Sequence, residues 1–229
     1  MKSNFIGTLV SNLVLISNFI IASIIFDNRY TRPVMNALFA YFTSLGPVPE
    51  ELLDYLTEVG RMERFARKSY LLKAGQVCRY LYFVEYGLLR CSYCRGTKEI
   101  SSGFAREGEL CMGAESFFSQ QIGYENIEVI ENCMVCYIGY ADLQCIYRDF
   151  PAFNAGARIL MEKCIVCTLQ RFAALWMQGA RDRYEWFLSR FPELDRRVPA
   201  KYLASYLGMT EVTLSIIKKG KKRMKGQTV

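Results

Sequence analysis

The sequence predicts an α+β protein that combines an antiparallel β-roll, one long helix and a C-terminal helix-turn-helix. The first observation is a run of short segments between residues 70 and 140 in which apolar and polar residues alternate, as in antiparallel strands. The second is an apolar pattern of helical period after Pro151. The third is the spacing of Ala204 and Gly208, which suits the crossing and the turn of a helix-turn-helix.

The chain divides into four parts. They are an apolar N-terminal extension (residues 1–34), a β-roll domain (35–150), a long helix (151–177) and a helix-turn-helix domain (178–229). The extension holds an uncharged apolar stretch from Phe5 to Phe26, which is long enough to cross a bilayer. Because Met35 begins the segment MNALFAYFTSL, typical of the first helix of a soluble domain, we interpret Met35 as the natural start and residues 1–34 as a start-site artefact. A membrane anchor, and hence a membrane-tethered protein, is the alternative.

Positive charge is concentrated at the C-terminus. Residues 178–229 contain 12 basic and 5 acidic residues, whereas the first 177 residues contain 17 of each. The whole net charge of +7 therefore belongs to the last quarter of the chain. Such a distribution favours contact between this segment and a polyanion.

Residue usage argues against an enzyme. The chain has no histidine, which removes the usual general base and the commonest nitrogen ligand of metals. No nucleophile can be paired with a base, so we expect no catalytic residue, no metal site and no cofactor. The nine cysteines are odd in number and several lie in apolar runs, which indicates reduced thiols in the cytoplasm.

The β-roll follows a short helix. Pro49 and two carboxylates begin that helix, which ends near Gly60. Turns at Gly75 and Gly87 then interrupt the alternating segment YLLKAGQVCRYLYFVEYGLLRCSYC, and the segments KEISSGFA, NIEVIE and CMVCYIGY continue the alternation. Short strands joined by glycine turns predict a small antiparallel roll.

Two apolar stripes run along the surface of the long helix. One runs from Phe153 through Cys164 to Ala174, and the other from Met161 through Ile165 to Leu175. One roll cannot cover both stripes, so we expect a second copy of the helix to pack there; a helix packed wholly within its own chain is the alternative. The predicted dimer seam consists of Phe153, Ala157, Leu160, Met161, Cys164, Ile165, Cys167 and Phe172.

The segment AKYLASYLGMTEVTLSIIKK, Ala200 to Lys219, predicts the helix-turn-helix. Ala204 is small where the two helices would cross, Gly208 suits a turn with positive φ, and Thr210 can cap the second helix. A plain helical hairpin is the alternative. The positions expected to pack between the helices are Leu203, Leu207, Met209, Leu214 and Ile217.

The second helix would enter the major groove of double-stranded DNA with its N-terminal face towards the bases. A basic tail follows it, which near a helix-turn-helix favours phosphate contacts over a merely solvated terminus. The predicted DNA-binding residues are Lys201, Thr210, Glu211, Val212, Thr213, Ser215, Ile216, Lys218, Lys219, Lys221 and Lys222.

Three of these segments, together with the long helix, resemble the Crp/Fnr superfamily: YLLKAGQVCRYLYFVEYGLLR, REGELCMGAESFF and RVPAKYLASYLGMTEVTLS. The resemblance extends from about Met35 to Lys222. It implies a cyclic-nucleotide-binding-like sensor roll, a dimerisation helix and a winged-helix-type DNA reader. It also implies a cytoplasmic homodimer that binds palindromic DNA near promoters, contacts RNA polymerase and carries an effector in the roll. The effector pocket would include Gly108, Glu109, Gly113, Glu115 and Ser116.

Two departures from the family pattern bear on function. Ala114 follows Gly113 where nucleotide-binding members have glutamate, and the stretch YENIEVI offers Glu125 and Glu128 but no arginine for a phosphate. Carboxylates cannot pair with an anion, so we expect no binding of cyclic AMP and leave the effector unknown. In the reading helix, Val212 and Ile216 replace the glutamate and arginine that commonly read cytosine and guanine. A sensor or partner-binding module with a degenerate DNA reader is therefore the alternative function.

Three CxxC pairs begin at Cys91, Cys133 and Cys164. The first two lie in predicted strands, where residues i and i+3 point to opposite faces, so we interpret them as buried thiols and not as metal ligands. The third lies on one side of the long helix. A redox crosslink through Cys164 and Cys167 at the dimer seam is a hypothesis.

Overall fold

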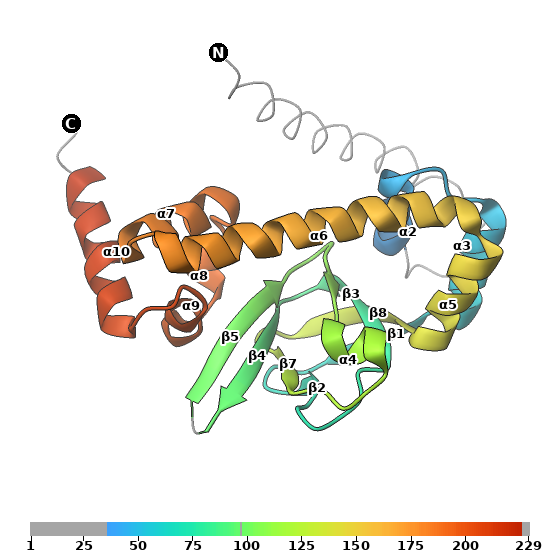
Figure 1. Ribbon diagram of the computed structural model, residues 1–229, viewed down its shortest axis with the longest axis horizontal. Helices are drawn as coiled ribbons and strands as arrows, with labels where there is room; N and C mark the ends of the chain where they lie inside the picture. Colours follow the sequence, from blue (N-terminus) through green and yellow to red (C-terminus); the bar gives the residue numbers. More distant parts are fainter. Residues whose placement is uncertain (1–35, 97, 226–229) are drawn as a thin grey trace, which may run out of the picture.

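The computed structural model describes residues 36–96 and 98–225. Figure 1 shows a β-roll below the middle of one long helix and a group of short helices at the end of that helix. The N-terminal extension, residues 1–34, lies outside the described residues. Within the described part of the chain, no helix is both long and apolar enough to cross a bilayer.

Two helices precede the sheets: α2 (Asn36–Leu45) and α3 (Glu50–Val59). The α3 helix follows Pro49 and carries two glutamates in its first turn, as the sequence predicts, where carboxylates favour the positive end of the helix dipole. Leu52 and Leu56, one turn apart, are fully buried against the roll. This spacing shows that one face of α3 closes the core of the roll.

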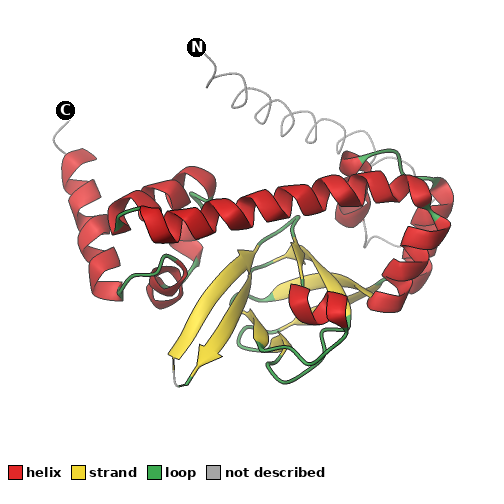
Figure 2. Cartoon of the chain, viewed as in Figure 1, coloured by secondary structure: helices red, strands yellow, loops and turns green. Residues whose placement is uncertain are grey.

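Eight strands form the roll, in two antiparallel sheets of order β1-β8-β3-β6 and β2-β7-β4-β5 (Figure 2). Their bounds are Arg61–Phe65 (β1), Tyr70–Leu72 (β2), Tyr80–Tyr86 (β3), Leu89–Arg95 (β4), Lys98–Ala105 (β5), Leu110–Cys111 (β6), Glu125–Val129 (β7) and Cys133–Gly139 (β8). The prediction of an antiparallel roll is confirmed. The pattern did not reveal β1, which is largely exposed and polar, or β6, which has two residues.

The glycine at position 87 is required by both backbone and space. Its φ is +101°, and a Cβ atom there would lie 2.4 Å from the carbonyl oxygen of Asn132. The predicted turn between β3 and β4 is therefore one that an L side chain cannot occupy without moving the β7–β8 turn.

Two short helices and one long helix complete this part of the chain: α4 (Ala114–Ser119), α5 (Tyr140–Asp149) and α6 (Pro151–Met177). The backbone N–H of Gly139 donates to the Asp142 carboxylate over 3.1 Å at the start of α5. On α6, Phe153 packs against Phe42 in the core of the roll, with ring centroids 5.1 Å apart. Phe153 is buried there, so its assignment to a dimer seam is wrong.

The C-terminal helices are α7 (Ala180–Arg190), α8 (Leu194–Arg197), α9 (Ala200–Tyr206) and α10 (Glu211–Lys225). They surround a second apolar cluster that includes Phe187, Leu203 and Leu214. The described residues after Gly139 contain helices but no strand, so the expected wing of a winged helix has no counterpart there.

The Glu85 carboxyl predicts an unusual pH dependence of stability. Burial raises its pKa to about 7, one of its oxygens has no partner among the described residues, and the backbone of Leu38 provides its hydrogen bond. A folded-state pKa above the unfolded value means that the folded protein binds the proton more tightly. The contribution of Glu85 to stability is then largest below the ordinary pKa of glutamate and falls as the pH rises towards 7.

We therefore expect Glu85→Gln to raise the free energy of unfolding by about 1 kcal/mol at pH 8, and by much less at pH 5. Urea denaturation at both pH values measures this difference. Glu58→Gln, at an exposed position on α3, is the matched control and should change neither value. Equal stabilisation by Glu85→Gln at both pH values would contradict the assignment.

Candidate nucleic-acid interface and effector cavity

The turn between α9 and α10 has the geometry that its sequence predicts. Gly208 adopts φ +65°, and the N–H of Met209 donates to the carbonyl of Ala204 over 3.0 Å. The side chain of Ala204 is buried where the two helices meet. Thr210 accepts a hydrogen bond from the N–H of Thr213 over 3.1 Å, which confirms the predicted cap of α10.

Apolar side chains lock the two helices together. Leu203, Leu207 and Leu214 are buried in the second cluster, and Met209 and Ile217 pack against it half-buried. All five positions predicted to lie between the helices therefore do so. The buried side chains of α10 and the turn before it therefore fix the orientation of the exposed face of this helix.

Thr210→Val should destabilise the start of α10, because valine keeps the shape of threonine but cannot accept the cap hydrogen bond. The loss of such a cap costs about 1 kcal/mol. Urea denaturation measures the cost, and hydrogen exchange of the first α10 amides locates it. Thr43→Val is the control, since the Thr43 hydroxyl only donates to the Phe39 carbonyl within α2. An equal loss in both variants would argue against the cap.

An exposed face of α10 carries an apolar pair. Val212 and Ile216 are 69% and 64% exposed, one turn apart. Ser215 and Lys219 are exposed at neighbouring positions of the same helix. The other predicted DNA-binding residues on the surface are Lys201, Thr210 and Glu211, and Thr213 is half-buried. The side chains of Lys221 and Lys222 lie outside the described residues.

Lys218 does not project from this face. Its ammonium group pairs with the Asp195 carboxylate of α8 at 2.7 Å and lies 5.7 Å from the centre of the Tyr184 ring. The prediction that Lys218 is free to contact DNA is therefore wrong: the residue ties α10 to α8. Periodicity alone could not show this, because the partner lies in another helix.

The helix-turn-helix packs directly on the roll, and α9 lies along β5 (Figure 1). The backbone N–H of Ser101 donates to the Ser205 hydroxyl over 3.0 Å. Arg171 of α6 donates to the carbonyls of Ser101, Ser102 and Tyr206. The hairpin of β4 and β5 is thus joined to both the long helix and α9.

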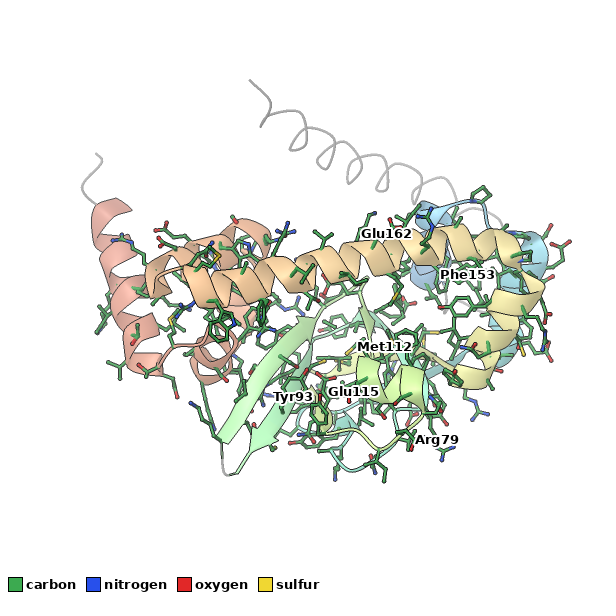
Figure 3. All side chains as sticks on the ribbon, viewed as in Figure 1. Arg79, Tyr93, Met112, Glu115, Phe153 and Glu162 are labelled. Carbon is green, nitrogen blue, oxygen red and sulfur yellow. The ribbon has the colours of Figure 1, made fainter. Side chains whose placement is uncertain are left out.

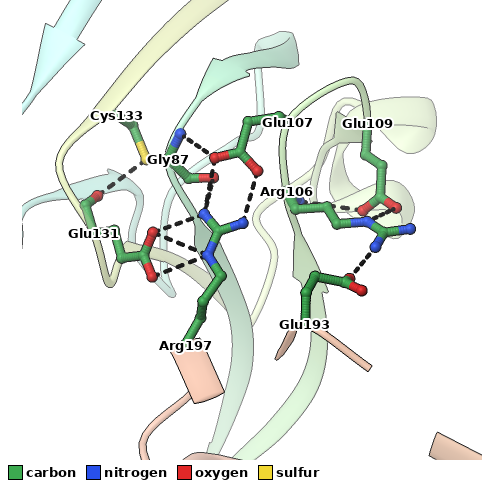
Figure 4. A network of polar contacts seen from close by, with 8 residues as sticks. All are labelled: Gly87, Arg106, Glu107, Glu109, Glu131, Cys133, Glu193 and Arg197. Carbon is green, nitrogen blue, oxygen red and sulfur yellow. Dashed lines mark hydrogen bonds and ion pairs between the residues drawn. The ribbon is translucent and has the colours of Figure 1, made fainter. Parts of the chain in front are cut away.

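Two arginines form ion pairs between the roll and the C-terminal helices: Arg106 of the roll and Arg197 of α8 (Figure 4). Arg197 reaches the carboxylates of Glu107 and Glu131 at 2.8 and 2.7 Å, and it also donates to the Gly87 carbonyl. The hydrogen bond from Arg197 lowers the pKa of Glu107 to about 2. Arg106 pairs in parallel with Glu109 and Glu193.

A buried arginine forms a third link, which the sequence did not suggest. Arg90 is 1% exposed and its guanidinium pairs with Glu99 and Glu128 at 2.8 and 2.9 Å. It also lies 3.7 Å from the centre of the Tyr202 ring of α9. Glu128 therefore faces Arg90, on the side of β7 opposite to Glu125, because successive residues of a strand point to opposite sides.

A cavity of about 130 Å³ lies between α4, β4 and β7. Three of the five predicted pocket residues line it: Gly113, Glu115 and Ser116. The other two do not. Gly108 forms a turn with φ +79° whose N–H donates to the Val84 carbonyl, and Glu109 pairs with Arg106. Neither residue lines this cavity, since their contacts are with Val84 and Arg106.

The lining of the cavity is acidic and aromatic. Glu125 accepts a hydrogen bond from the Ser102 hydroxyl over 2.7 Å, and Tyr93 and Tyr124 stand beside it with ring centroids 5.4 Å apart. None of the described residues that line the cavity is basic. Burial raises the pKa of Glu125, since no cation compensates its charge.

No model of a protein family matches the chain, and neither does any curated protein. Solved structures do. A mutant of CooA from Carboxydothermus hydrogenoformans gives a TM-score of 0.63 at 18% identity, with 86% of this chain and 87% of CooA covered. The c-di-GMP responsive global regulator CLP from Xanthomonas campestris gives 0.62 at 17% identity, with 78% and 93% covered. A regulator from Eubacterium rectale assigned to the Crp/Fnr family gives 0.60 at 12% identity, with 77% and 85% covered.

The chain has the Crp/Fnr fold. The likeness covers three quarters or more of the chain in each case. This likeness concerns the arrangement of helices and strands. The chemistry of the candidate sites is argued from the residues of this chain.

In this Crp/Fnr fold, the long helix turns its two stripes in different directions. Ala157 and Ala174 of the first stripe face the roll and the C-terminal helices. Of the second stripe, Ile165 and Phe172 face outward, whereas Met161 and Leu175 are half-buried. Leu169 and Trp176, which the predicted stripe did not include, complete an exposed row: Ile165, Leu169, Phe172 and Trp176 are exposed by 55, 61, 60 and 77%. The spacing of these four residues, alternately four and three positions apart, is that of a coiled-coil seam.

The remaining seam residues divide between these faces. Leu160 and Met161 are half-buried, and Cys164 and Cys167 are exposed. On a helix of 3.6 residues per turn, Cys164 and Cys167 share a side with Arg171 and Ala174, and Arg190 of the same chain approaches the Cys167 sulfur at 3.7 Å. Both thiols are nevertheless exposed, and the redox crosslink through Cys164 and Cys167 stays a hypothesis.

All nine cysteines are free thiols. No group of three or more cysteine, aspartate or glutamate side chains among the described residues is placed to hold a metal ion. The sulfurs of Cys91 and Cys111 lie 3.4 Å apart across the roll. Their proximity could not be predicted from the sequence, because the two cysteines belong to different sheets.

Proposed function

We propose that this protein is a homodimeric, DNA-binding transcription regulator of the Crp/Fnr type. The observation that carries the proposal is the capped, tightly packed helix-turn-helix, whose second helix leaves Val212, Ser215, Ile216 and Lys219 open to a groove. Binding, and not catalysis, is the proposed activity, and no cofactor is required.

The chemistry of α10 suggests how it would contact DNA. Val212 and Ile216 can touch thymine methyl groups but cannot make the bidentate hydrogen bonds that identify guanine or adenine. Lys201 and Lys219, both exposed, suit phosphates. We therefore propose that phosphate contacts supply most of the affinity and that sequence preference is modest.

The exposed stripe of α6, defined as Ile165, Leu169, Phe172 and Trp176, supports the homodimer. Four large apolar side chains in a continuous row are rare on the surface of a monomer. A second α6 helix has the matching shape and would cover the row by twofold symmetry. Two readers would then meet two half-sites of a palindrome.

Contact with RNA polymerase, a cytoplasmic location and an effector other than cyclic AMP complete the proposal. The acidic lining of the cavity supports the last point, because a cyclic phosphate requires a cation that the described lining lacks. A sensor with a degenerate DNA reader is the second candidate, favoured by the apolar pair on α10. A membrane-tethered regulator depends on residues 1–34, which lie outside the described residues.

Fluorescence anisotropy with mixed genomic duplexes tests DNA binding. We expect affinity to fall about 100-fold between about 50 and 200 mM salt, because about four phosphates would release counterions. Lys201→Ala and Lys219→Ala should each weaken binding and reduce the salt slope by about 2, because the homodimer loses two lysines in each variant. Arg61→Ala, which removes an exposed charge on β1, is the control and should leave binding unchanged. Absence of binding to any duplex at low salt would favour the degenerate reader.

A further inference from the structure

The cavity between α4, β4 and β7 combines an aromatic wall with two carboxylates. The rings of Tyr93 and Tyr124 are 5.4 Å apart and inclined at 50°, so they form a corner and not a flat stack. Glu115 and Glu125 line the same space as the two rings, and Figure 3 labels Tyr93 and Glu115 on the roll. Two ring faces and two carboxylates are the groups that attract organic cations.

Glu125 has hydrogen-bond donors but no counter-charge. The Ser102 hydroxyl donates to one of its oxygens over 2.7 Å, and the Tyr93 phenol also bonds to the carboxylate. Both donors are neutral. A half-buried carboxylate without a cation is destabilised by lost hydration, and the raised pKa of Glu125 has this origin. A bound cation would remove the penalty.

Size and ligand type narrow the class of cation. A cavity of about 150 Å³ holds benzene, so 130 Å³ admits a group of similar size. A metal ion would find too few oxygen ligands, because no cluster of three acidic or thiol side chains exists among the described residues. A compact alkylammonium group satisfies both the volume and the aromatic corner.

We propose that this cavity binds a small organic ammonium ion, held by Glu125 and Glu115 and covered by Tyr93 and Tyr124. The proposal rests on the proposed function, since it names the chemical class of the effector. The same residues connect to the reader. Ser102, which donates to Glu125, accepts a hydrogen bond from Arg171 of α6 through its carbonyl.

Isothermal titration calorimetry on the full chain tests the proposal with three probes: choline, tetramethylammonium and butylamine. The matched neutral probe is 3,3-dimethylbutan-1-ol, in which carbon replaces the nitrogen of choline. We expect at least one ammonium probe to bind with a millimolar or lower dissociation constant, and the neutral probe to bind at least about tenfold more weakly than choline-like cations.

Two variants locate the site. Glu125→Gln keeps the shape and the hydrogen bond from Ser102 but removes the charge, and Tyr93→Leu removes one ring; each should weaken cation binding about tenfold. Glu58→Gln on α3 should bind as the unaltered protein does. Thermal melting of each variant verifies folding, and the two variants at different strands guard against the failure of either to fold.

Equal affinity for choline and its neutral analogue, unaltered binding in both variants, or no heat from any ammonium probe up to about 20 mM would overturn the proposal. Titration is done without DNA, so it is independent of the reader. A chain that binds ammonium ions but no duplex refutes the regulator and retains the ammonium site, whereas a chain that binds duplex but no ammonium probe does the reverse.

Discussion

A protein that carries Leu169→Asp and Phe172→Asp is expected to sediment as a single subunit at concentrations where the unaltered chain is dimeric. Both side chains are at least 60% exposed in one subunit, so their replacement leaves the core of that subunit intact. In a paired α6, each aspartate would be buried without a cation, which costs several kcal/mol. The dissociation constant should therefore rise by a factor of about 100 or more.

Analytical ultracentrifugation over a concentration series measures this change. The control is Val166→Asp, which adds a carboxylate about a quarter of a turn away from Ile165 at a position that is also exposed. The control should remain a dimer. A double variant that sediments as the unaltered protein, or an unaltered chain that is a monomer at high concentration, would contradict the seam on α6.

The affinity for DNA should also fall when dimerisation is lost. A single reader would contact about half the phosphates, so the salt slope of the double variant should be about half that of the dimer. This second readout separates loss of pairing from damage to the reader, because damage to α10 would lower affinity without changing the mass of the particle in solution.

The helix-turn-helix was predictable because its determinants are local. Ala204, Gly208 and Thr210 lie within seven residues, and each acts on the backbone or on its immediate neighbour. The alternation of the central strands was similarly visible, since one side of each faces the core. The β1 strand was not, because it is an exposed edge strand of mainly polar residues whose place is fixed by pairing with β8.

The direction of the α6 stripes could not be derived from the helix alone. Both stripes are apolar at helical spacing, and only the position of the roll and of the C-terminal helices decides which is covered. The same reason explains the errors at Phe153 and Lys218. Each has the residue type expected for its predicted role, but its side chain contacts a residue from a distant segment. Phe153 packs on Phe42, and Lys218 pairs with Asp195.

The candidate effector cavity was partly predictable. Gly113, Glu115 and Ser116 belong to one continuous segment that leads into α4, and the structure brings them to the lining. Tyr93 comes from β4, and its approach to this segment depends on the pairing of β4 with β7. Sequence spacing carries no information on that pairing, so the aromatic wall became visible only in the folded chain.

Arg197→Ala is expected to release the reader from the roll. Arg197 lies on α8, yet its hydrogen-bond partners are Gly87, Glu107 and Glu131 of the roll, 66 to 110 residues away in the sequence. Alanine leaves two carboxylates close together without their cation. Because charge-assisted hydrogen bonds are lost and repulsion remains, the free energy of unfolding should fall by about 2–4 kcal/mol.

Urea denaturation measures the loss, and faster hydrogen exchange in α8 and α9 locates it. Arg148→Ala is the control, because Arg148 pairs with Asp149 on the surface of α5, where solvent screens the pair, and its loss should leave stability unchanged. The link should also respond to acid. Arg197 depresses the pKa of Glu107 to about 2, so its stabilisation is complete above the ordinary pKa of glutamate and is lost as the pH falls towards 2. If Arg197→Ala and the unaltered chain lose stability equally between pH 5 and pH 3, Arg197 does not hold α8 on the roll through Glu107.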